Sequence, residues 1–275
     1  MPQIAQLKKS EKSPTLTHRS LERGLSLIEI VGGSNGPLGL AEIARRSGLH
    51  RSTAHHLLQT LVSLGYLRQD GATRCYELAA KLFQLTEQIW TPEQLGVLAR
   101  PFVSELARIS GEGASCAAYH DGIVRIVAKF EQERPMRVVD NAVAARPIHA
   151  TAVARAIVAF MPKRELDAML GTLTYEQFTP RTIVKRRALE IELGRIRTSG
   201  VAFDDEEHIE GIRCIAAPVR IYNGQVIASL CAVGPKSRMT RQRLRELKTP
   251  ILELAAALSA RLGSRPDDRR PPKVA

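Results

Sequence analysis

The segment 38–78, LGLAEIARRSGLHRSTAHHLLQTLVSLGYLRQDGATRCYEL, constrains the fold of this chain more than any other. It predicts a short helix at Ala41–Ser47, ended by Gly48, because glycine readily takes the left-handed conformation that terminates many helices. A second helix is expected at Arg51–Leu64, ended by Gly65. Two short helices joined by a tight turn are typical of a helix-turn-helix.

The second expected helix has two different faces. Apolar residues recur at helical spacing and predict one buried stripe. The stripe comprises Ala54, Leu57, Leu58, Leu61 and Leu64. The opposite face carries the hydrogen-bonding side chains of Ser52, His55, His56 and Gln59. Side chains of these types can read base edges in the major groove of DNA.

A basic hairpin follows the second helix. Tyr66–Arg68 and Thr73–Leu78 are predicted strands, and Asp70-Gly71 between them is a hairpin turn signal. Helix, turn, helix and basic hairpin in this order indicate a winged helix-turn-helix, in which the second helix enters the groove.

The same segment supplies candidate contacts to a double-stranded DNA operator. The outward face of the second helix lacks acids, which would repel phosphates. Basic residues stand in the hairpin and just before the turn, where backbone phosphates would lie. The predicted DNA-binding residues are Arg45, Arg46, Arg51, Ser52, Thr53, His55, His56, Gln59, Arg68 and Arg74.

The net charge supports a polyanionic partner only weakly. The 275 residues carry a formal charge of +12. Residues 1–90 hold 11 Lys and Arg against 7 Asp and Glu, and residues 91–275 hold 29 against 21. The basic excess is therefore spread along the chain and is not confined to the DNA-reading segment. The length is sufficient for about two domains.

The four cysteines predict neither a disulfide framework nor a metal site. Cys75, Cys116, Cys214 and Cys231 form no C-x-x-C pair and stand at no zinc-finger spacing from a histidine. No cofactor is expected, and reduced thiols are typical of a cytoplasmic protein. No membrane partner is expected, because the N-terminal segment lacks an apolar signal core and no apolar run approaches about 18 residues.

The chain divides into five predicted segments. They are a disordered arm (1–17), a winged helix-turn-helix domain (18–79), a linker helix (80–92), a second domain (93–262) and a disordered tail (263–275). In the first domain Ser20 is a candidate cap for a helix whose predicted apolar stripe comprises Leu21, Leu25, Ile28 and Val31.

The second domain alternates hairpins with helices. Expected strands are Ser115–Tyr119, Ile123–Lys129, Ile212–Tyr222 and Gln225–Val233, the last two flanking the turn signal Asn223-Gly224. Expected helices are Glu93–Ser110, Thr151–Met161, Lys163–Gly171, Arg181–Ser199 and Arg241–Leu262. Hairpins covered by helices indicate an α+β domain with an antiparallel sheet.

Three segments of this domain, together with the helix-turn-helix, resemble one family. They are RPIHATAVARAIVAFMP (146–162), GVAFDDEEHIEGIRCIAAPV (200–219) and NGQVIASLCAVGP (223–235). The chain resembles the IclR family, named for the isocitrate lyase regulator. The resemblance implies a bacterial transcriptional regulator with a winged helix, a linker helix and a C-terminal effector domain of GAF-like fold. It also implies DNA binding as dimers or pairs of dimers, tuned by small organic acids.

The effector residues follow in part from the chemistry and in part from the resemblance. Free backbone N–H groups at the start of the helix near residue 151 can receive a small acid. The resemblance implies contacts from the backbone of Ala152 and Val153, from the carboxyl of Asp204 and from the thiol of Cys214. Two serines of an S-x-S-G-P run are also implied.

The sequence departs from that pattern at two places. The serine positions are occupied by Cys231 and Val233, and Ala154-Arg155 stands where the family usually has Gly and then Lys. Because both hydroxyls are missing, a less polar, aromatic acid fits the site better than a tiny polar acid such as glyoxylate. Cys231 and Val233 are then expected to line the less polar side of the site.

Two other functions remain open from the residues alone. One is a DNA-binding protein that needs no ligand. The other is an enzyme that uses Cys214 with His149 or His208 and Asp204. Cys214 lies in an apolar, strand-like run and not at a helix N-terminus, which disfavours an activated thiolate. No catalytic residue is therefore predicted.

The chain is expected to be at least a dimer. One helix-turn-helix reads only a short half-site, so two copies are needed for useful specificity. The candidate contact is the apolar face of the linker helix, formed by Leu82, Leu85, Ile89 and Trp90. A homodimer or a homotetramer satisfies this requirement.

Overall fold

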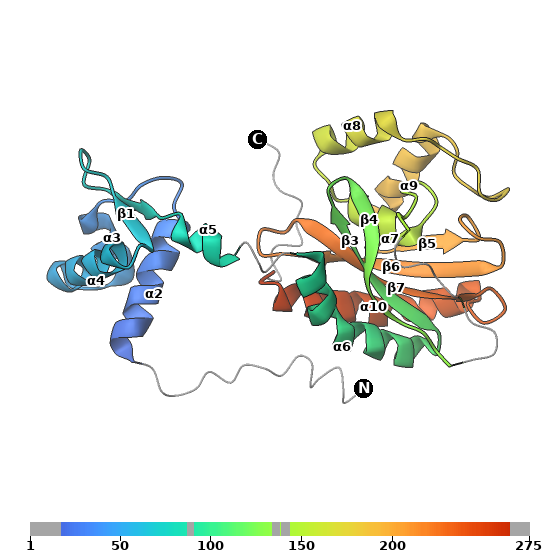
Figure 1. Cartoon of the computed structure of the whole chain (residues 1–275), viewed down its shortest axis with the longest axis horizontal. Helices are drawn as coiled ribbons and strands as arrows, with labels where there is room; N and C mark the ends of the chain where they lie inside the picture. Colours follow the sequence, from blue (N-terminus) through green and yellow to red (C-terminus); the bar gives the residue numbers. More distant parts are fainter. Residues whose placement is uncertain (1–17, 87–90, 134–137, 139–143, 265–275) are drawn as a thin grey trace. The chain divides into compact units, whose positions relative to one another are not determined.

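The computed structural model describes residues 18–86, 91–133, 138 and 144–264 (Figure 1). The chain forms two compact units that divide between Thr91 and Pro92. The predicted arm at 1–17 and most of the predicted tail, residues 265–275, lie outside the described residues.

Short helices and a small antiparallel sheet make up the first unit. They are α2 (Arg19–Gly32), α3 (Leu40–Ser47), α4 (Arg51–Ser63), β1 (Leu67–Gln69), β2 (Tyr76–Leu78) and α5 (Lys81–Thr86). Gly48 ends α3 with a φ of 65°, as the sequence predicted. Leu27, Ile43 and Leu58 are fully buried in an aliphatic core between the helices.

The buried face of α2 differs from the predicted stripe. Gly24, Leu27 and Val31 are buried, whereas Leu21 and Leu25 are 64% and 53% exposed. Both sets have helical spacing, and contact with α3 and α4 selects the first. The helix begins at Arg19 after His18, so the prediction of Ser20 as its cap is wrong.

In the wing, the hairpin of β1 and β2, the first strand is shifted by one residue, the second is shorter and the turn is longer than predicted. Asp70 Oδ1 accepts hydrogen bonds from the backbone N–H and the hydroxyl of Thr73, both at 2.7 Å, and Arg74 has a φ of 58°. This side-chain turn occupies residues 70–75, so Asp70-Gly71 is not a two-residue hairpin turn. Within the predicted linker helix, the structure shows α5, and residues 87–90 lie outside the described part of the chain.

The second unit is an antiparallel sheet with helices on both faces (Figure 1). The strands lie in the order β4 (Ile123–Phe130), β3 (Gly113–His120), β7 (Val226–Pro235), β6 (Ile212–Arg220) and β5 (Ala202–Asp205). The helices α6 (Pro92–Ser110) and α10 (Arg241–Arg261) cover one face. The helix α7 (Ala152–Val158) packs on the other face, with α8 (Lys163–Thr172) and α9 (Arg186–Ser199) beyond it. The α+β prediction is confirmed.

Some boundaries in this unit differ from the sequence prediction. The helix expected from Arg181 begins only at Arg186, because the Thr182 hydroxyl accepts the N–H of Thr179 and donates to the Glu207 carbonyl. These bonds hold the segment as a turn. The helix expected at Thr151–Met161 ends at Val158. The strand β5 was not predicted, because its four residues AFDD give too short a pattern.

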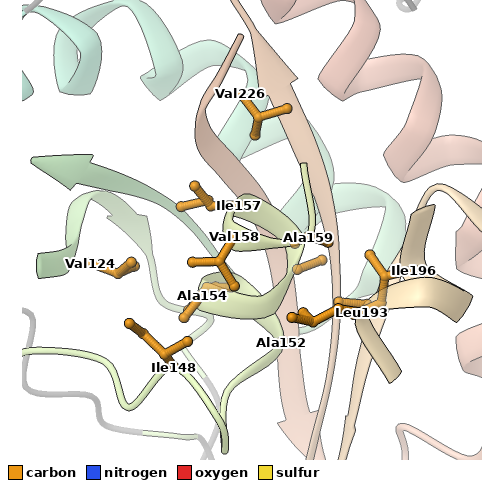
Figure 2. Close-up of a cluster of buried hydrophobic side chains, with 14 of the residues drawn as sticks. Val124, Ile148, Ala152, Ala154, Ile157, Val158, Ala159, Leu193, Ile196 and Val226 are labelled. Atoms are coloured by element: carbon orange, nitrogen blue, oxygen red, sulfur yellow. The ribbon is translucent and has the colours of Figure 1, made fainter. Parts of the chain in front are cut away.

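The helix α7 is the centre of the core on its side of the sheet. Its residues 152–158 are all buried, and its alanines allow the backbone to approach the strands closely. The Ser229 hydroxyl on β7 donates to the Val153 carbonyl at 2.9 Å. Figure 2 shows Leu193 and Ile196 of α9 packed around this cluster. Burial of a Val or Ile side chain contributes about 1.5–3 kcal/mol to stability, so Val153, Ile157 and Val158 hold α7 on the sheet.

Candidate DNA-reading surface and effector cavity

The predicted reading face of α4 is exposed. Its exposed residues are Arg51, Ser52, His55, His56 and Gln59, and Thr53 is half-buried. Ala54, Leu58 and Leu61 form the buried face. Leu64, predicted to join them, follows the end of α4 and is 52% exposed. The helix therefore presents its hydrogen-bonding side chains to solvent, as groove reading requires.

Gln59 is bonded to the wing. Its amide nitrogen donates to the Tyr76 hydroxyl at 3.3 Å and to Gln69 Oε1 at 3.5 Å. Tyr76 is fully buried, so this contact ties the reading face to the core of the unit. In the wing turn, Arg74 is exposed.

Three of the predicted phosphate contacts have acidic partners within the chain. Glu42 accepts hydrogen bonds from Arg45 and Arg46, and these bonds lower its pKa to about 2. Arg68 pairs with Glu77 at 2.5 Å. Neither acid was predicted as a partner from the sequence. They offset part of the positive charge, while the three arginine side chains stay exposed to solvent.

A cavity lies at the N-terminal end of α7, bounded by α7, the sheet and the β5–β6 loop. The cavity has a volume of about 50 Å³, which is room for a few waters or a small acid. Its lining residues are Ser115, Ile126, Val138, Arg146, Thr151, Ala152, Val153, Asp204, His208, Ile209, Ile212, Cys214, Cys231 and Val233. All the residues predicted to hold an effector are among them.

Strand pairing explains why these residues gather. Asp204 on β5 lies opposite Cys214 on β6, and Cys214 lies opposite Val233 on β7. Cys231, two residues before Val233, lies opposite Ser115 on β3. Residues directly opposite each other point to the same face of a sheet. The strands thus form two neighbouring rows of side chains under the first turn of α7.

Several polar lining residues were not predicted as effector contacts from the sequence. Ser115 places a hydroxyl on the strand beside Cys231, although the two expected serines are absent. Arg146 is only 9% exposed, and His208 lines the cavity from the β5–β6 loop. Neither Arg146 nor Ser115 has a local signal. Arg146 is one of two arginines in the segment 146–162, and the register of β3 on β7, which places Ser115, is not visible in the sequence.

Asp204 is a buried carboxyl with few compensating contacts. Burial raises its pKa to about 7, although the backbone N–H of Glu207 and the charge of Arg155 act in the opposite direction. The N–H of Glu207 donates to Asp204 Oδ1 at 2.8 Å. The carboxyl therefore changes charge near neutral pH and can serve a ligand as donor or acceptor.

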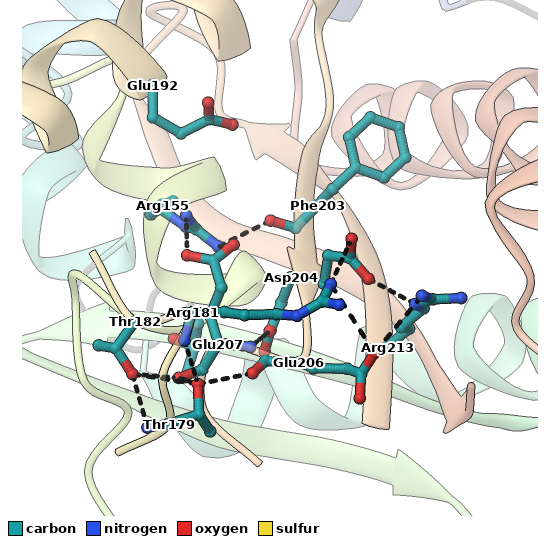
Figure 3. A network of polar contacts seen from close by, with 12 residues as sticks. Arg155, Thr179, Arg181, Thr182, Glu192, Phe203, Asp204, Glu206, Glu207 and Arg213 are labelled. Atoms are coloured by element: carbon teal, nitrogen blue, oxygen red, sulfur yellow. Dashed lines mark hydrogen bonds and ion pairs between the residues drawn. The ribbon is translucent and has the colours of Figure 1, made fainter. Parts of the chain in front are cut away.

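Arg155 fixes the β5–β6 loop, which follows Asp204 along the chain. Its fully buried guanidinium donates to both carboxylate oxygens of Glu207 at 2.8 Å and to the Phe203 carbonyl at 2.7 Å (Figure 3). From the other side, hydroxyls of the turn at 179–182 donate to carbonyls of the same loop. Since Glu207 also donates to Asp204, Arg155 positions one wall of the cavity through two successive contacts.

The two histidines considered from the sequence lie in different places. His149 Nε2 lies 2.8 Å from the Glu176 carbonyl oxygen, and its ring packs on Tyr175 and Phe178, so it contributes to structure. His208 lines the cavity and contacts Phe178 edge-on, with ring centroids 5.1 Å apart.

The fold and these surfaces define a class of protein, the DNA-binding transcriptional regulator with a separate effector domain. Residues 20–71 match the family model for the IclR helix-turn-helix domain, and residues 91–260 match that for the bacterial transcriptional regulator IclR C-terminal domain. The chain belongs to the IclR family.

Two known relatives are similar in sequence to this chain over most of their length. The chain is 30% identical over 249 residues to the HTH-type transcriptional regulator BhcR of Paracoccus denitrificans, covering 90% of this chain and 89% of the relative. It is 32% identical over 248 residues to the glycerol operon regulatory protein of Streptomyces griseus, covering 90% and 97%.

Two solved structures share the fold at 21% sequence identity each. A putative IclR regulator from Silicibacter has a TM-score of 0.70 and covers 90% of this chain and 98% of its own. An IclR homologue from Microbacterium hydrocarbonoxydans, complexed with 4-hydroxybenzoate, has a TM-score of 0.54 and covers 88% and 99%. At this identity the likeness concerns the fold alone.

Two negative findings apply to the described residues only. None of their helices is both long and apolar enough to cross a bilayer. Nor do three or more of their His, Cys, Asp or Glu side chains gather as they would around a metal ion.

Proposed function

We propose that this IclR-type regulator reads a DNA operator with α4 and the wing, and that a small organic acid bound in the cavity changes its operator affinity. The observation that carries the proposal is the convergence of all six predicted effector residues on one cavity. Buried polar groups are costly unless they find a partner, and a polar ligand supplies one.

The DNA contacts divide by chemistry. Ser52, Thr53, His55, His56 and Gln59 on α4 are proposed to contact base edges. Arg45, Arg46, Arg51, Arg68 and Arg74 are proposed to contact phosphates, which sets position and affinity but not sequence preference.

The effector is proposed to touch the backbone at Ala152 and Val153 and the side chains of Asp204 and Cys214. Cys231 and Val233 offer the less polar part of the wall. An aromatic acid suits this wall, and a solved IclR homologue holds 4-hydroxybenzoate. A small aliphatic acid fits the cavity as it stands, whereas a ring requires the lining side chains to move apart.

The test uses the full chain and labelled DNA fragments from upstream of its own gene and the neighbouring genes. Fluorescence anisotropy is expected to show specific binding that one or more acids of a mixed aliphatic and aromatic panel weakens or strengthens. Operator binding that no acid alters would favour the ligand-independent alternative. Failure of every fragment to bind specifically would contradict the proposed reading surface.

A second experiment concerns the wall of the cavity. Replacing Cys231 and Val233 together by Ser is expected to shift the ranking of acids in calorimetry toward smaller, more polar ones, because two buried hydroxyls then seek partners. DNA affinity without ligand is expected to stay unchanged. An unaltered ranking would remove these two residues from the effector site.

A cysteine-dependent enzyme is the second candidate, because Cys214, Asp204 and His208 line the same cavity. An activated thiolate reacts quickly with iodoacetamide at neutral pH. Under the regulator proposal, Cys214 is expected to react no faster than an ordinary thiol. Fast, site-selective alkylation of Cys214 would favour the enzyme.

A further inference from the structure

The cavity contains a charged group that the proposed effector residues do not include. Arg146 and Asp204 carry the formal charges among the described lining residues, and they are 9% and 4% exposed. A guanidinium at the wall of a ligand-sized cavity presents paired donors that match a carboxylate, so Arg146 is a candidate recognition group for an anionic ligand.

The backbone of Arg146 is firmly placed. Its N–H donates to the Val124 carbonyl on β4 at 2.9 Å. The next residue is Pro147, which favours extended backbone at Arg146. The carbonyl of Pro147 accepts the N–H and the hydroxyl of Thr151, just before α7. Arg146 is thus anchored between an edge strand and the first turn of α7, where a side chain can be held in one orientation.

Arg146 and Asp204 approach the cavity from opposite sides. Arg146 is bonded to β4, and Asp204 lies on β5, which are the two edge strands of the sheet. Ser115, Cys214 and Cys231 lie on the strands between. The lining is therefore cationic at one end and carboxylic at the other.

We propose that Arg146 determines effector specificity by binding the carboxylate, and that Asp204 receives a hydroxyl at the opposite end of the same ligand. The effector class is then a small hydroxy carboxylic acid. This inference rests on the proposed effector-sensing function and deepens it by assigning an orientation to the ligand.

The chemistry favours arginine over the start of α7 as the main carboxylate contact. A guanidinium offers a planar pair of donors that matches a carboxylate, and bonds between charged groups are stronger than neutral ones. The helix α7 has only seven residues. The N–H groups of its first turn can supplement the arginine but carry a small dipole.

The test compares matched ligands by calorimetry on the full chain. The first series is 4-hydroxybenzoate, its neutral analogue 4-hydroxybenzamide, and benzoate, which lacks the hydroxyl. The second series is 4-hydroxybutyrate, 4-hydroxybutyramide and butyrate, in which the hydroxyl again stands at the end opposite the carboxylate. In at least one series, the wild type is expected to bind the hydroxy acid about tenfold or more tighter than the amide, the size expected for loss of a charged hydrogen bond. It is also expected to prefer the hydroxy acid to the acid without the hydroxyl.

Variants assign the preference to residues. Arg146→Met is expected to abolish the preference for acid over amide, and Arg146→Lys to keep part of it. Arg125→Met is the matched control, because Arg125 is an exposed arginine on the adjacent strand β4. Asp204→Ala is expected to abolish only the preference for the hydroxyl. Thermal melting checks that each variant is folded. The comparison of acid and amide on the wild type does not depend on any variant.

The outcomes distinguish a failure of this inference from a failure of the proposed effector-sensing function. Equal binding of acid and amide by the wild type, or an acid preference that survives in Arg146→Met, would overturn the role of Arg146 and leave effector sensing intact. If no probe of either series binds and no acid alters operator binding, the effector-sensing function fails as well.

Discussion

Asp204 links the cavity to pH at the scale of one residue. Burial raises its pKa from 3.8 to about 7, so the folded protein holds a proton there that the unfolded chain releases. The contribution of this group to the free energy of unfolding is fully present below about pH 4 and is lost as the pH rises to about 7. Asp204→Asn is expected to gain stability relative to wild type over that range, by up to about 4 kcal/mol at ~1.4 kcal/mol per pH unit.

The measurement is chemical denaturation without ligand from pH 4 to pH 8. Asp205→Asn is the matched control. Burial raises the pKa of Asp205, but hydrogen bonds from Arg241 and Arg213 outweigh it and lower that pKa below its usual value. The control is therefore expected to lose stability relative to wild type as the pH rises. A pH-independent difference for Asp204→Asn would show that this carboxyl titrates normally.

The environment of Arg155 leads to a second prediction at the scale of one residue. It is fully buried and bonded to both oxygens of Glu207 (Figure 3). Arg155→Met leaves Glu207 as a poorly exposed, unpaired charge and is expected to destabilise the effector unit by about 3–5 kcal/mol. Adding Glu207→Gln is expected to recover much of the loss. Arg186→Met, which breaks exposed pairs with Asp167 and Glu190, is expected to cost only about 0–1 kcal/mol.

Urea denaturation of the four proteins measures these differences. Equal losses for Arg155→Met and Arg186→Met would mean that the buried pair has no special role. A stable Arg155→Met protein with weakened acid binding would instead show that the pair serves only to position the loop at Asp204.

At the scale of elements, α4 and the wing are expected to contribute in different ways. Gln59→Ala removes a group proposed to contact a base, so discrimination between operator and altered operator is expected to fall by about 1–3 kcal/mol. Arg68→Ala removes a group proposed to contact a phosphate, so affinity is expected to fall on all sequences and the salt dependence to flatten. Arg195→Ala, which changes an exposed arginine of the second unit, is the control.

Anisotropy titrations at several salt concentrations, on operator and scrambled DNA, separate the two effects. The assignment fails if Gln59→Ala weakens both DNAs equally, or if residues 92–275 alone bind the operator as well as the whole chain does.

The sequence predicted the elements better than the faces they bury. The helices α3, α4, α6 and α10 were predicted to within one or two residues, because glycines, caps and apolar spacing mark them locally. In α2, leucines on both sides gave two stripes of equal spacing, and only contact with α3 and α4 decides between them. The boundary of α9 depended on Thr182, whose bonds to Glu207 connect distant parts of the chain.

The cavity could be predicted only in part for the same reason. Motifs identified Ala152, Val153, Asp204, Cys214, Cys231 and Val233, all of which line it. Ser115 and Arg146 enter through the register of β3 on β7 and the anchoring of Arg146 to β4. Such non-local pairing leaves no periodic signal in a single sequence, so the charge at one end of the cavity became visible only in the folded chain.

At the scale of the whole molecule, the first unit exposes apolar side chains that a second copy is expected to cover. Leu21 and Leu25, one turn apart on α2, are 64% and 53% exposed, and Leu85 on α5 is 54% exposed. Leu85 belongs to the linker face predicted as a dimer contact, whereas Ile89 and Trp90 of that face lie outside the described residues. Burying the exposed leucine surface between two copies stabilises the dimer by about 25 cal/mol per Å² of apolar area removed from water.

The chain is therefore expected to have at least a dimeric mass by light scattering at micromolar concentration, since two half-sites give the specificity that one helix-turn-helix lacks. Changing Leu21, Leu25 and Leu85 together to Lys is expected to weaken association of the DNA-reading units and to lower operator affinity more than half-site affinity. Leu64→Lys, at a leucine of similar exposure after α4, is the control. A monomeric wild type with operator present would contradict the dimer, and a triple variant that binds the full operator normally would place the contact elsewhere.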